Sequence, residues 1–388
     1  MNRKVKVLYY VQHLLGVGHV FRTMRIIDAL TRSGFAVELI YGGERLPNFK
    51  ADGAKVHFLP SLTSDKGDFS NLIDENGSTA SDAYKADRRD RILRVLGDCD
   101  PEILITEAFP FGRRQMHFEL LPLMEAVSER RERTKVFCSV RDILQEGNKV
   151  SKDRQTVDLL TRYFDGVLVH GDPDLIDLSA TFPFAAEIAH MTYYTGIVTP
   201  HATGESLMDK DRFDVVVSVG GGMLGRDLVR AAAQAKAMTS LSSDRWCILT
   251  GPFMEDADRA GLDALGVEVR RFVPDLCATL KSAQLSISLA GYNTVADIMA
   301  AGCRAVIAPQ WNDKETEQLK RAELLASRGL AVMLTHKDKT PGRISEAVNR
   351  AMSMPPPDWS QIRQNGADDT AQFLTRAVEQ PSSSNKLP

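Results

Sequence analysis

The alternation of short apolar runs with helical segments is the feature that most restricts the fold of this chain. Apolar runs such as 5–11 (VKVLYYV) and 213–220 (FDVVVSVG) alternate with amphipathic stretches such as 22–34 (RTMRIIDALTRSG). Apolar runs of strand length that are separated by helices are typical of parallel strands buried on both faces. The pattern therefore predicts an α/β fold with doubly wound, Rossmann-like sheets. We expect strands at 5–11, 36–42, 55–60, 102–108, 135–140, 166–171, 213–220, 245–251, 267–273, 285–290 and 304–310.

The predicted strands form two series, which indicates two domains that face each other across a cleft. A polar segment at 195–212 (TGIVTPHATGESLMDKDR) separates the series, and 388 residues are enough for two domains. We expect a last amphipathic helix to cross back to the first domain. The expected parts are an N-terminal domain at 1–198, a linker at 199–212, a C-terminal domain at 213–354, the helix at 355–378 and a disordered tail at 379–388.

Composition indicates a soluble cytoplasmic protein. The chain is 43% hydrophobic and 26% charged with a net charge of −3, so nucleic acid is not an expected partner. No apolar stretch approaches the roughly 20 residues of a membrane span, and we expect no signal peptide. The five cysteines are scattered and form no metal-binding or disulfide pattern. We therefore expect no cofactor and no metal, and at most peripheral membrane contact.

The most polar stretch of the chain, 63–91, predicts a long loop followed by a helix. Such an element could act as a lid or bind an acceptor. Four arginines follow at Arg88, Arg89, Arg91 and Arg94. We interpret them as a solvated helix face, although anionic lipid head groups are an alternative ligand.

A glycine-rich turn at 218–232 (SVGGGMLGRDLVRAA) joins a predicted strand to a helix. Bare backbone amides and a helix N-terminus can bind a phosphate group closely. An ordinary tight turn needs one or two glycines, whereas this turn has four, and no Walker lysine follows them. We therefore predict phosphate binding here by Gly220, Gly221, Gly222, Gly225 and Arg226.

A second strand–turn–helix passage lies at 288–310 (SLAGYNTVADIMAAGCRAVIAPQ). Ser288, Gly291, Asn293 and Thr294 are placed to offer hydroxyls and amides to another phosphate. Asp297, one turn into the helix, could accept both hydrogens of a ribose diol. Helix capping is the alternative for each polar residue, but a second glycine turn in one domain favours a nucleotide site.

Other candidate donor-binding residues follow predicted strands in the same domain. Gly251 ends one strand, and Phe272 or Val273 could line a base pocket, with core packing as the alternative. Glu317 and Gln318 open a helix and could reach sugar hydroxyls, or they could belong to a solvated helix face.

The first domain carries a histidine between its first strand and helix, in LGVGHVFR (15–22). Gly16 and Gly18 alone are weak evidence for a dinucleotide site, because Phe21 stands where a third glycine is needed. A helix N-terminus disfavours the imidazolium of His19, so a neutral ring could act as a general base. Capping of the helix is the alternative. Glu107 ends another strand and could orient His19 or bind an acceptor hydroxyl, and Gly18 is included among the donor-binding candidates.

These motifs resemble the GT-B glycosyltransferases related to the MurG-type N-acetylglucosaminyltransferases of glycosyltransferase family 28. The resemblance lies in GHVFRTMRIIDAL (18–30) and, over 288–331, in SLAGYNTVADIMAAGCRAVIAPQ and EQLKRAELLASRGLA. FPFG and RDIL resemble a group of predicted glycosyltransferases of the same superfamily. The resemblance implies that the C-terminal domain holds a nucleotide sugar and the N-terminal domain an acceptor, with metal-independent inversion at the anomeric carbon.

Residue by residue, the resemblance places His19 at the family's glycine-flanked histidine and Gly220–Gly222 at its diphosphate loop. Asp297 falls at the ribose-binding glutamate, Gln318 in the glutamine motif and Arg321 at an asparagine. UDP is the donor nucleotide implied.

Three functions follow as hypotheses. The first is an inverting, metal-independent glycosyltransferase that transfers a sugar from a UDP-sugar to an acceptor hydroxyl. The acceptor could be a small molecule, a glycan or a lipid-linked compound. The second is a nucleotide-sugar hydrolase or epimerase, because Gly16, Gly18, His19 and Arg22 also resemble UDP-sugar hydrolases of the pseudaminic acid route. The third is a non-catalytic nucleotide-sugar binding protein.

Overall fold

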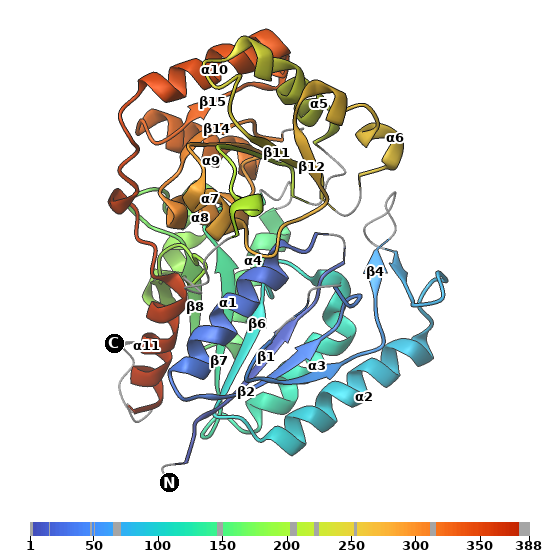
Figure 1. Ribbon diagram of the computed structural model, residues 1–388. Coiled ribbons are helices and arrows are strands. Elements are labelled where there is room, and N and C mark those ends of the chain that lie inside the picture. Colours follow the sequence, from blue (N-terminus) through green and yellow to red (C-terminus); the bar gives the residue numbers. More distant parts are fainter. Residues whose placement is uncertain are drawn as a thin grey trace. The chain divides into compact units, whose positions relative to one another are not determined.

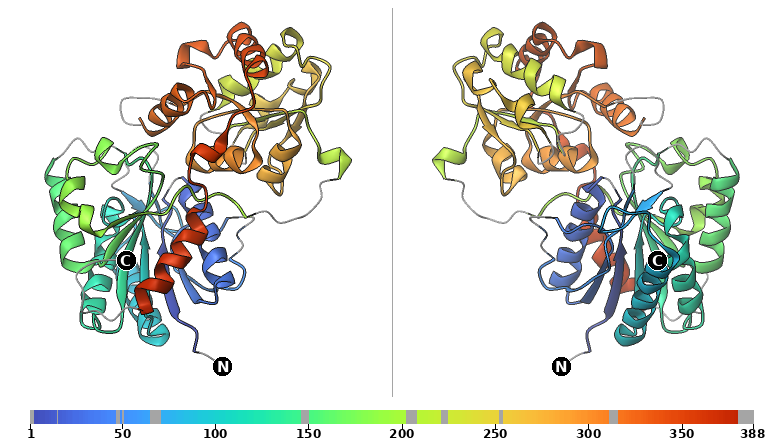
Figure 2. Two further views of the ribbon diagram at one scale, coloured as in Figure 1. Left: turned by 90° about the vertical axis from the view of Figure 1, so that its left-hand side faces the viewer. Right: turned by 90° about the vertical axis from the view of Figure 1, so that its right-hand side faces the viewer.

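The computed structural model describes residues 3–14, 16–46, 49, 51–64, 71–145, 150–201, 208–220, 225–251, 254–310 and 316–379. The chain divides into two compact units, each built around one parallel sheet (Figures 1 and 2). The first unit contains residues 1–198 together with 365–388, and the second contains 199–364.

The first unit is a seven-stranded parallel sheet in the order β3-β2-β1-β6-β7-β8-β9. Its central strands are buried along their length, as the continuous apolar runs predict. The strands are β1 (Lys6–Val11), β2 (Ala36–Tyr41), β3 (Lys55–Phe58), β6 (Ile103–Glu107), β7 (Lys135–Arg141), β8 (Gly166–His170) and β9 (Thr192–Tyr194).

Helices pack on the sheet of the first unit as neighbouring pairs. The α1 helix (Gly18–Arg32) packs against α11 (Gly366–Glu379), the last helix of the chain (Figure 2). The α2 helix (Asp82–Cys99) packs against α3 (His117–Ser128), and α3 against α4 (Val150–Tyr163). The apolar core includes residues of all three of these last helices.

Local contacts hold α11 in the first unit. The N–H of Gly366 donates to the Ile197 oxygen at 3.0 Å, and a β-carbon on Gly366 would lie 2.3 Å from the Gly196 oxygen. Further along α11, the buried ring of Phe373 stacks on Tyr193, with 4.3 Å between the ring centroids. The close approach at residue 366 therefore requires glycine.

The second unit is a six-stranded parallel sheet in the order β12-β11-β10-β13-β14-β15. Its core is made of the inward residues of these strands with α5 and α10, which pack on each other. The strands are β10 (Val215–Ser218), β11 (Trp246–Leu249), β12 (Glu268–Arg270), β13 (Leu285–Ser288), β14 (Arg304–Ile307) and β15 (Val332–Met333). The helices are α5 (Arg226–Ala235), α6 (Asp256–Arg259), α7 (Leu276–Ser282), α8 (Tyr292–Ala301), α9 (Glu317–Ser327) and α10 (Pro341–Ser353).

Each of the expected strands is present, and the structure adds four short ones. β9 and β15 lie at the edges of the two sheets, while β4 (Thr63–Ser64) and β5 (Leu72–Ile73) pair as an antiparallel ladder. The polar stretch 63–91 is therefore not a simple loop before a helix. Residues 65–70 lie outside the described residues, and α2 begins at Asp82 behind the N-cap Ser81.

The order of the strands reverses once in each sheet. In the first unit the chain runs outward from β1 to β3 and then continues at β6 on the other side of β1. In the second unit it runs from β10 to β12 and continues at β13. Ligands of open α/β sheets bind at the carboxyl ends of the strands at such a reversal. The loops after β1, β6, β10 and β13 are therefore the places to look for a site.

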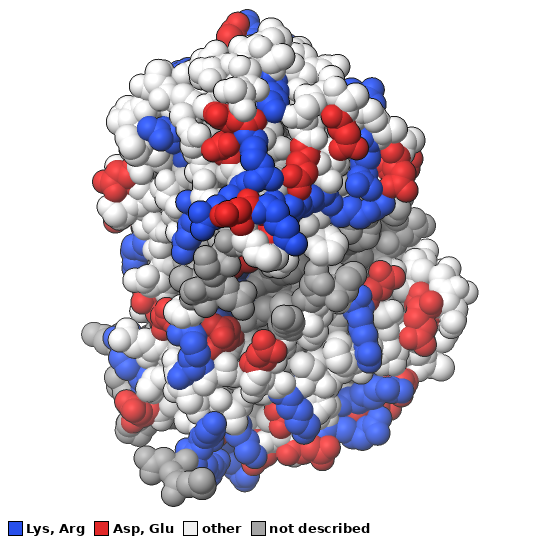
Figure 3. All heavy atoms as spheres, viewed as in Figure 1, with Lys and Arg blue, Asp and Glu red and all other residues white. Residues whose placement is uncertain are grey.

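Acidic and basic side chains are mixed on the face of the molecule shown in Figure 3. Of the four clustered arginines, Arg89 pairs with Asp90 at 2.7 Å and Arg91 with Asp87 at 2.9 Å. Arg88 corrects the interpretation of a solvated face, because its side chain is fully buried.

Candidate functional site

His19 lies at the strand reversal of the first unit, as the second residue of α1. The N-cap of α1 is Val17, whose side chain makes no capping hydrogen bond. The contact of the half-buried His19 ring is instead with Arg113, whose Nη2 lies 2.6 Å from His19 Nε2. A guanidinium only donates hydrogen bonds, so Nε2 accepts and Nδ1 carries the proton of the neutral ring.

Burial lowers the pKa of His19 well below its usual range, and neighbouring positive charges lower it further. The neighbouring groups that contribute are Arg113, Arg22, His13 and Arg141, in order of effect. The pKa of His13 is also lowered, chiefly by burial. The ring of His19 is therefore neutral at physiological pH, which is the protonation state that a general base requires.

Glu107 ends β6 on the same edge of the sheet and is fully buried. Its carboxylate forms an ion pair with Arg22 of α1 and accepts a hydrogen bond from Ser139 Oγ at 2.7 Å. The hydroxyl of Tyr9 is 3.1 Å away. The partner of the Glu107 carboxylate is therefore Arg22, and the burial of Glu107 leaves no exposed oxygen for an acceptor hydroxyl.

The network continues from Ser139 to His170, whose Nε2 lies 2.9 Å from Ser139 Oγ. The other ring nitrogen of His170 lies 2.8 Å from Thr195 Oγ1. Burial lowers the pKa of His170 well below its usual range, so this ring is neutral. Side chains from β7, β8 and the segment after β9 thus support Glu107 beneath α1.

A second buried network lies at the ends of β1 and β2. Arg88 of α2 pairs with Glu119 of α3 at 2.8 Å and also donates to Gln12 Oε1 at 2.8 Å. A β-carbon on Gly42 would lie 2.1 Å from Gln12 Oε1, and one on Gly43 would lie 2.1 Å from the ring of His13. The glycine pair after β2 therefore makes room for the side chains that follow β1.

In the second unit, Gly220 and Gly225 flank the phosphate-binding turn predicted after β10. Gly220 has φ = 61°, a left-handed conformation that favours glycine. A β-carbon on Gly225 would lie 2.2 Å from that of Val219, so glycine is also required where α5 begins. Gly221 and Gly222 lie outside the described residues. Arg226, the first residue of α5, is exposed.

The turn after β13 lies beside the turn after β10, because these strands are paired. Ser218 and Ser288 are register partners at the carboxyl ends of the two strands, and both are buried. Neither hydroxyl has a hydrogen-bond partner among the described residues. Buried hydroxyls are rarely left unpaired, so this pair marks a place for a polar ligand or water. Gly291 is the N-cap of α8, with no side-chain cap and open space around its Cα.

The α9 helix holds the turn after β13 in place. Gln318 Oε1 accepts from the N–H groups of Ala290 and Gln310, each at 3.1 Å. Arg321 donates to the Ala290 oxygen at 2.9 Å and pairs with Glu317 at 2.8 Å. Glu317 and Arg321 are both buried, which contradicts the interpretation of a solvated helix face. These side chains therefore position the start of α8.

The remaining predicted residues follow strands at the same edge of the sheet. Asn293 and Thr294 are half-buried in the first turn of α8, and Asp297 one turn later is 6% exposed. After β12, Val273 is half-buried and Phe272 is 55% exposed, so Phe272 offers an aromatic face to solvent. Gly251 follows β11 in a left-handed conformation with φ = 74°.

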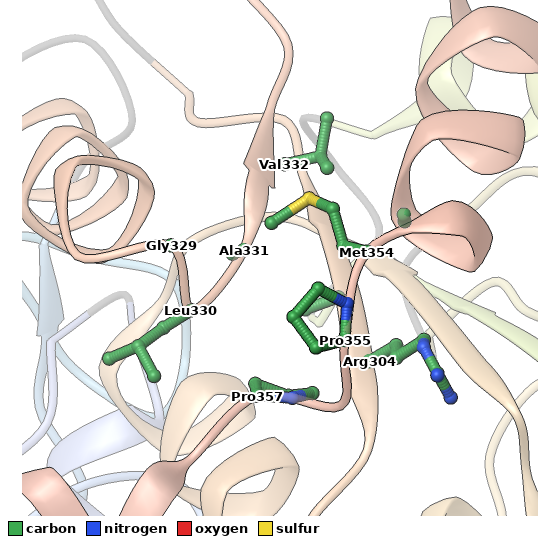
Figure 4. Close-up of a pocket in the computed structure, with 10 residues that line it drawn as sticks. Arg304, Gly329, Leu330, Ala331, Val332, Met354, Pro355 and Pro357 are labelled. Carbon is green, nitrogen blue, oxygen red and sulfur yellow. The ribbon is translucent and has the colours of Figure 1, made fainter.

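Figure 4 shows a small pocket elsewhere in the second unit, at the amino ends of β14 and β15. Its lining is largely apolar and includes Leu330, Met354 and Pro355, but none of the predicted site residues. Within the described residues, no helix is long and apolar enough to cross a membrane. The same part of the chain contains no group of three or more His, Cys, Asp or Glu that could hold a metal ion.

Solved structures share this two-unit architecture over nearly the whole chain. MurG of Acinetobacter baumannii has a TM-score of 0.59 at 17% identity, covering 97% of this chain and 99% of that one. The glycosyltransferase VinC, solved in complex with dTDP, has a TM-score of 0.60 at 16% identity, covering 97% and 100%. The fold is therefore the GT-B fold, which confirms the predicted fold class.

The sequence comparisons find a match to a particular glycosyltransferase family in the second half of the chain. Residues 215–377 match the glycosyltransferase family 28 C-terminal domain. An uncharacterized glycosyltransferase of Methanopyrus kandleri is 28% identical over 165 residues, which are 42% of this chain and 45% of the relative. A UDP-N-acetylglucosamine–N-acetylmuramyl-(pentapeptide) pyrophosphoryl-undecaprenol N-acetylglucosamine transferase of Thermotoga neapolitana is 26% identical over 177 residues, 46% and 50% of the two chains.

These alignments span about half of the curated relatives. Residues 215–377 are thus similar to a family 28 C-terminal domain, and the fold of the chain is GT-B.

Sequence reasoning missed Arg113 and Gln12. Arg113 lies 94 residues from His19 in the chain, so no local spacing connects them. The available signal was a pair of arginines shortly after a predicted strand, in LITEAFPFGRR (104–114). Gln12 directly follows β1, and its backbone oxygen accepts from Arg113 Nε at 2.8 Å.

Proposed function

We propose that the protein is an inverting glycosyltransferase that moves a sugar from a UDP-sugar to an acceptor hydroxyl without a metal ion. The observation that carries the proposal is the neutral His19, with a lowered pKa, at the strand reversal of the first unit. The family 28 match of residues 215–377 supports a nucleotide sugar as donor. Relatives named as UDP-N-acetylglucosamine transferases favour UDP.

In the proposed reaction, His19 takes the proton of the acceptor hydroxyl. The acceptor oxygen then bonds to the anomeric carbon, and the bond from that carbon to the diphosphate breaks. The bonding electrons leave with the nucleoside diphosphate, and the proton remains on the imidazolium of His19.

The negative charge of the leaving group requires stabilisation in the second unit. The N-cap of α8 is Gly291, which makes no side-chain cap, and the turn after β10 has a left-handed glycine at Gly220. Helix N-termini and free amides bind phosphate groups favourably. The buried hydroxyls of Ser218 and Ser288 add hydrogen-bond donors at the same edge. These groups support a site that needs no metal.

The acceptor is a small molecule, a glycan or a lipid-linked compound that the first unit binds. A cytoplasmic location is part of the proposal. It is supported by the five cysteines, which are buried free thiols and would suit a reducing compartment.

The test measures donor binding and turnover separately. Calorimetry with UDP, GDP and dTDP identifies the nucleotide, and release of free nucleoside diphosphate is then followed with and without a panel of acceptors. We expect release that depends on an acceptor, and His19→Gln should abolish it while donor affinity is unchanged. His190→Gln, at an exposed position of the same unit, is the control variant.

Three results would count against the proposal. Release without any acceptor would indicate a hydrolase, and UDP binding without release would indicate a binding protein. Loss of donor affinity in His19→Gln would contradict the role of His19 as a base.

A further inference from the structure

The loop after β6 has an unusual backbone that presents one side chain to His19. Ala108 and Arg113 have φ values of 64° and 62°, and neither is glycine. Left-handed conformations are unfavourable for such residues and persist where the surroundings impose them. Here the Ala108 N–H donates to the Ser139 oxygen at 2.8 Å, and the Gly112 N–H donates to the Ala108 oxygen at 2.7 Å. The loop is thus held in the form that places Arg113.

Arg113 differs from the buried arginines of the described residues. Its guanidinium donates to the Gln12 oxygen at 2.8 Å and to His19 Nε2 at 2.6 Å, and neither partner is a carboxylate. Each of the buried arginines is instead neutralised by an acidic side chain: Arg22 by Glu107, Arg88 by Glu119 and Arg321 by Glu317. The Arg113 cation is therefore held beside His19 without a carboxylate in hydrogen-bond contact, although the charge of Glu107 favours its protonated form.

We propose that Arg113 is a positioning residue that fixes His19 in the Nδ1–H tautomer and covers Nε2 until an acceptor hydroxyl replaces the guanidinium. The inference rests on the proposed function for the part that concerns the acceptor. Its first part, the control of the ring by Arg113, is a property of the protein without ligands. The lone pair on Nε2 would take the acceptor proton, and it is the lone pair to which Arg113 donates its hydrogen bond.

The charges around the ring agree with this role. Among the neighbouring groups that lower the pKa of His19, Arg113 has the largest effect, ahead of Arg22, His13 and Arg141. Burial also lowers the pKa of Arg113 itself, as expected for a guanidinium without a carboxylate partner. A protonated His19 would place a second cation against Arg113, so the contact favours the neutral ring.

The test is ¹⁵N NMR of histidine-labelled protein without substrate, with the His19 signals assigned by their loss in His19→Gln. In the native protein we expect an Nδ1–H tautomer that resists protonation. In Arg113→Met we expect the His19 pKa to rise by about one pH unit or more, the usual size for loss of a nearby charge, and the tautomer preference to weaken. In Arg113→Lys, which keeps a cation and a donor, the His19 pKa and tautomer preference should lie closer to those of the native protein.

Arg114→Met is the matched control, because Arg114 donates to the Lys152 oxygen and Thr156 rather than to His19. It should leave the His19 titration unchanged. An unchanged His19 pKa and tautomer in Arg113→Met would overturn the proposal, and if that variant does not fold, an unchanged His19 pKa in the uncharged variant Arg113→Gln would do the same.

Turnover provides the second readout. The acid limb of the pH profile should move upward in Arg113→Met together with the NMR pKa. If His19→Gln keeps full turnover while Arg113→Met still raises the pKa of His19, the proposed function fails and the control of His19 by Arg113 stands. If the pKa and tautomer of His19 do not change in Arg113→Met, Arg113 does not control the ring, whatever the activity of the variant.

Discussion

Replacement of Glu107 by glutamine should destabilise the first unit far more than the same change at Glu102. Glu107 is fully buried against Arg22, whose side chain is 4% exposed. Removal of one partner from a buried ion pair costs about 3–5 kcal/mol, because the remaining charge is left uncompensated. Glutamine keeps the shape and can still accept the bonds from Arg22 and Ser139, so we expect the lower end, about 3 kcal/mol.

Glu102 is the matched control, since it directly precedes the same strand. Its side chain is 28% exposed and pairs with Arg3, which is 75% exposed. An exposed pair of this kind contributes at most about 1 kcal/mol. The two substitutions make the same chemical change opposite an arginine, and they differ in the burial of the ion pair.

Urea unfolding followed by circular dichroism and by tryptophan fluorescence measures the difference. Of the three tryptophans of the chain, Trp246 and Trp359 are buried in the second unit and Trp311 lies outside the described residues, so fluorescence reports mainly on that unit. We expect Glu107→Gln to lower the midpoint seen by circular dichroism more than the midpoint seen by fluorescence. If Glu107→Gln is as mild as Glu102→Gln, Glu107 does not compensate Arg22 in the way described here.

Two other predictions concern pH and the glycine turns. The pKa values of His19 and His170 are lowered in the folded state, so the unfolded chain takes up more protons as the pH falls below about 6.5. Thermal midpoints should therefore fall from pH 7.5 to 5.5, and His170→Gln should flatten that dependence; a steeper slope in the variant would contradict the assignment. Gly225→Ala should destabilise the second unit by about 1–3 kcal/mol through its clash with Val219. Gly291→Ala, which meets open space, should have little effect on unfolding, and equal losses in the two variants would refute this steric argument.

The positions of the main strands could be predicted because their cause is local. A strand buried on both faces is mostly apolar, so β1, β6, β10 and β13 are visible in the sequence as short runs rich in Val, Ile and Leu. The glycine turn after β10 is also visible in the sequence, because a left-handed backbone at Gly220 and a close approach at Gly225 favour glycine at those positions. In contrast, β9 and β15 have two or three residues, and they exist only because the neighbouring strand offers hydrogen-bond partners.

The partners of the charged side chains could be decided only by the tertiary structure. Glu107 was predicted as a group for His19 or an acceptor, but Arg22 lies against it from a helix that begins 89 residues earlier in the chain. Arg88 was predicted on a solvated face, but it faces Glu119 of the neighbouring helix. His19 could be recognised as a candidate from its loop, whereas its contact with Arg113 depends on two strands becoming neighbours in the sheet. Apolar burial is encoded within a few residues, while the charge that a buried side chain meets depends on segments far apart in sequence.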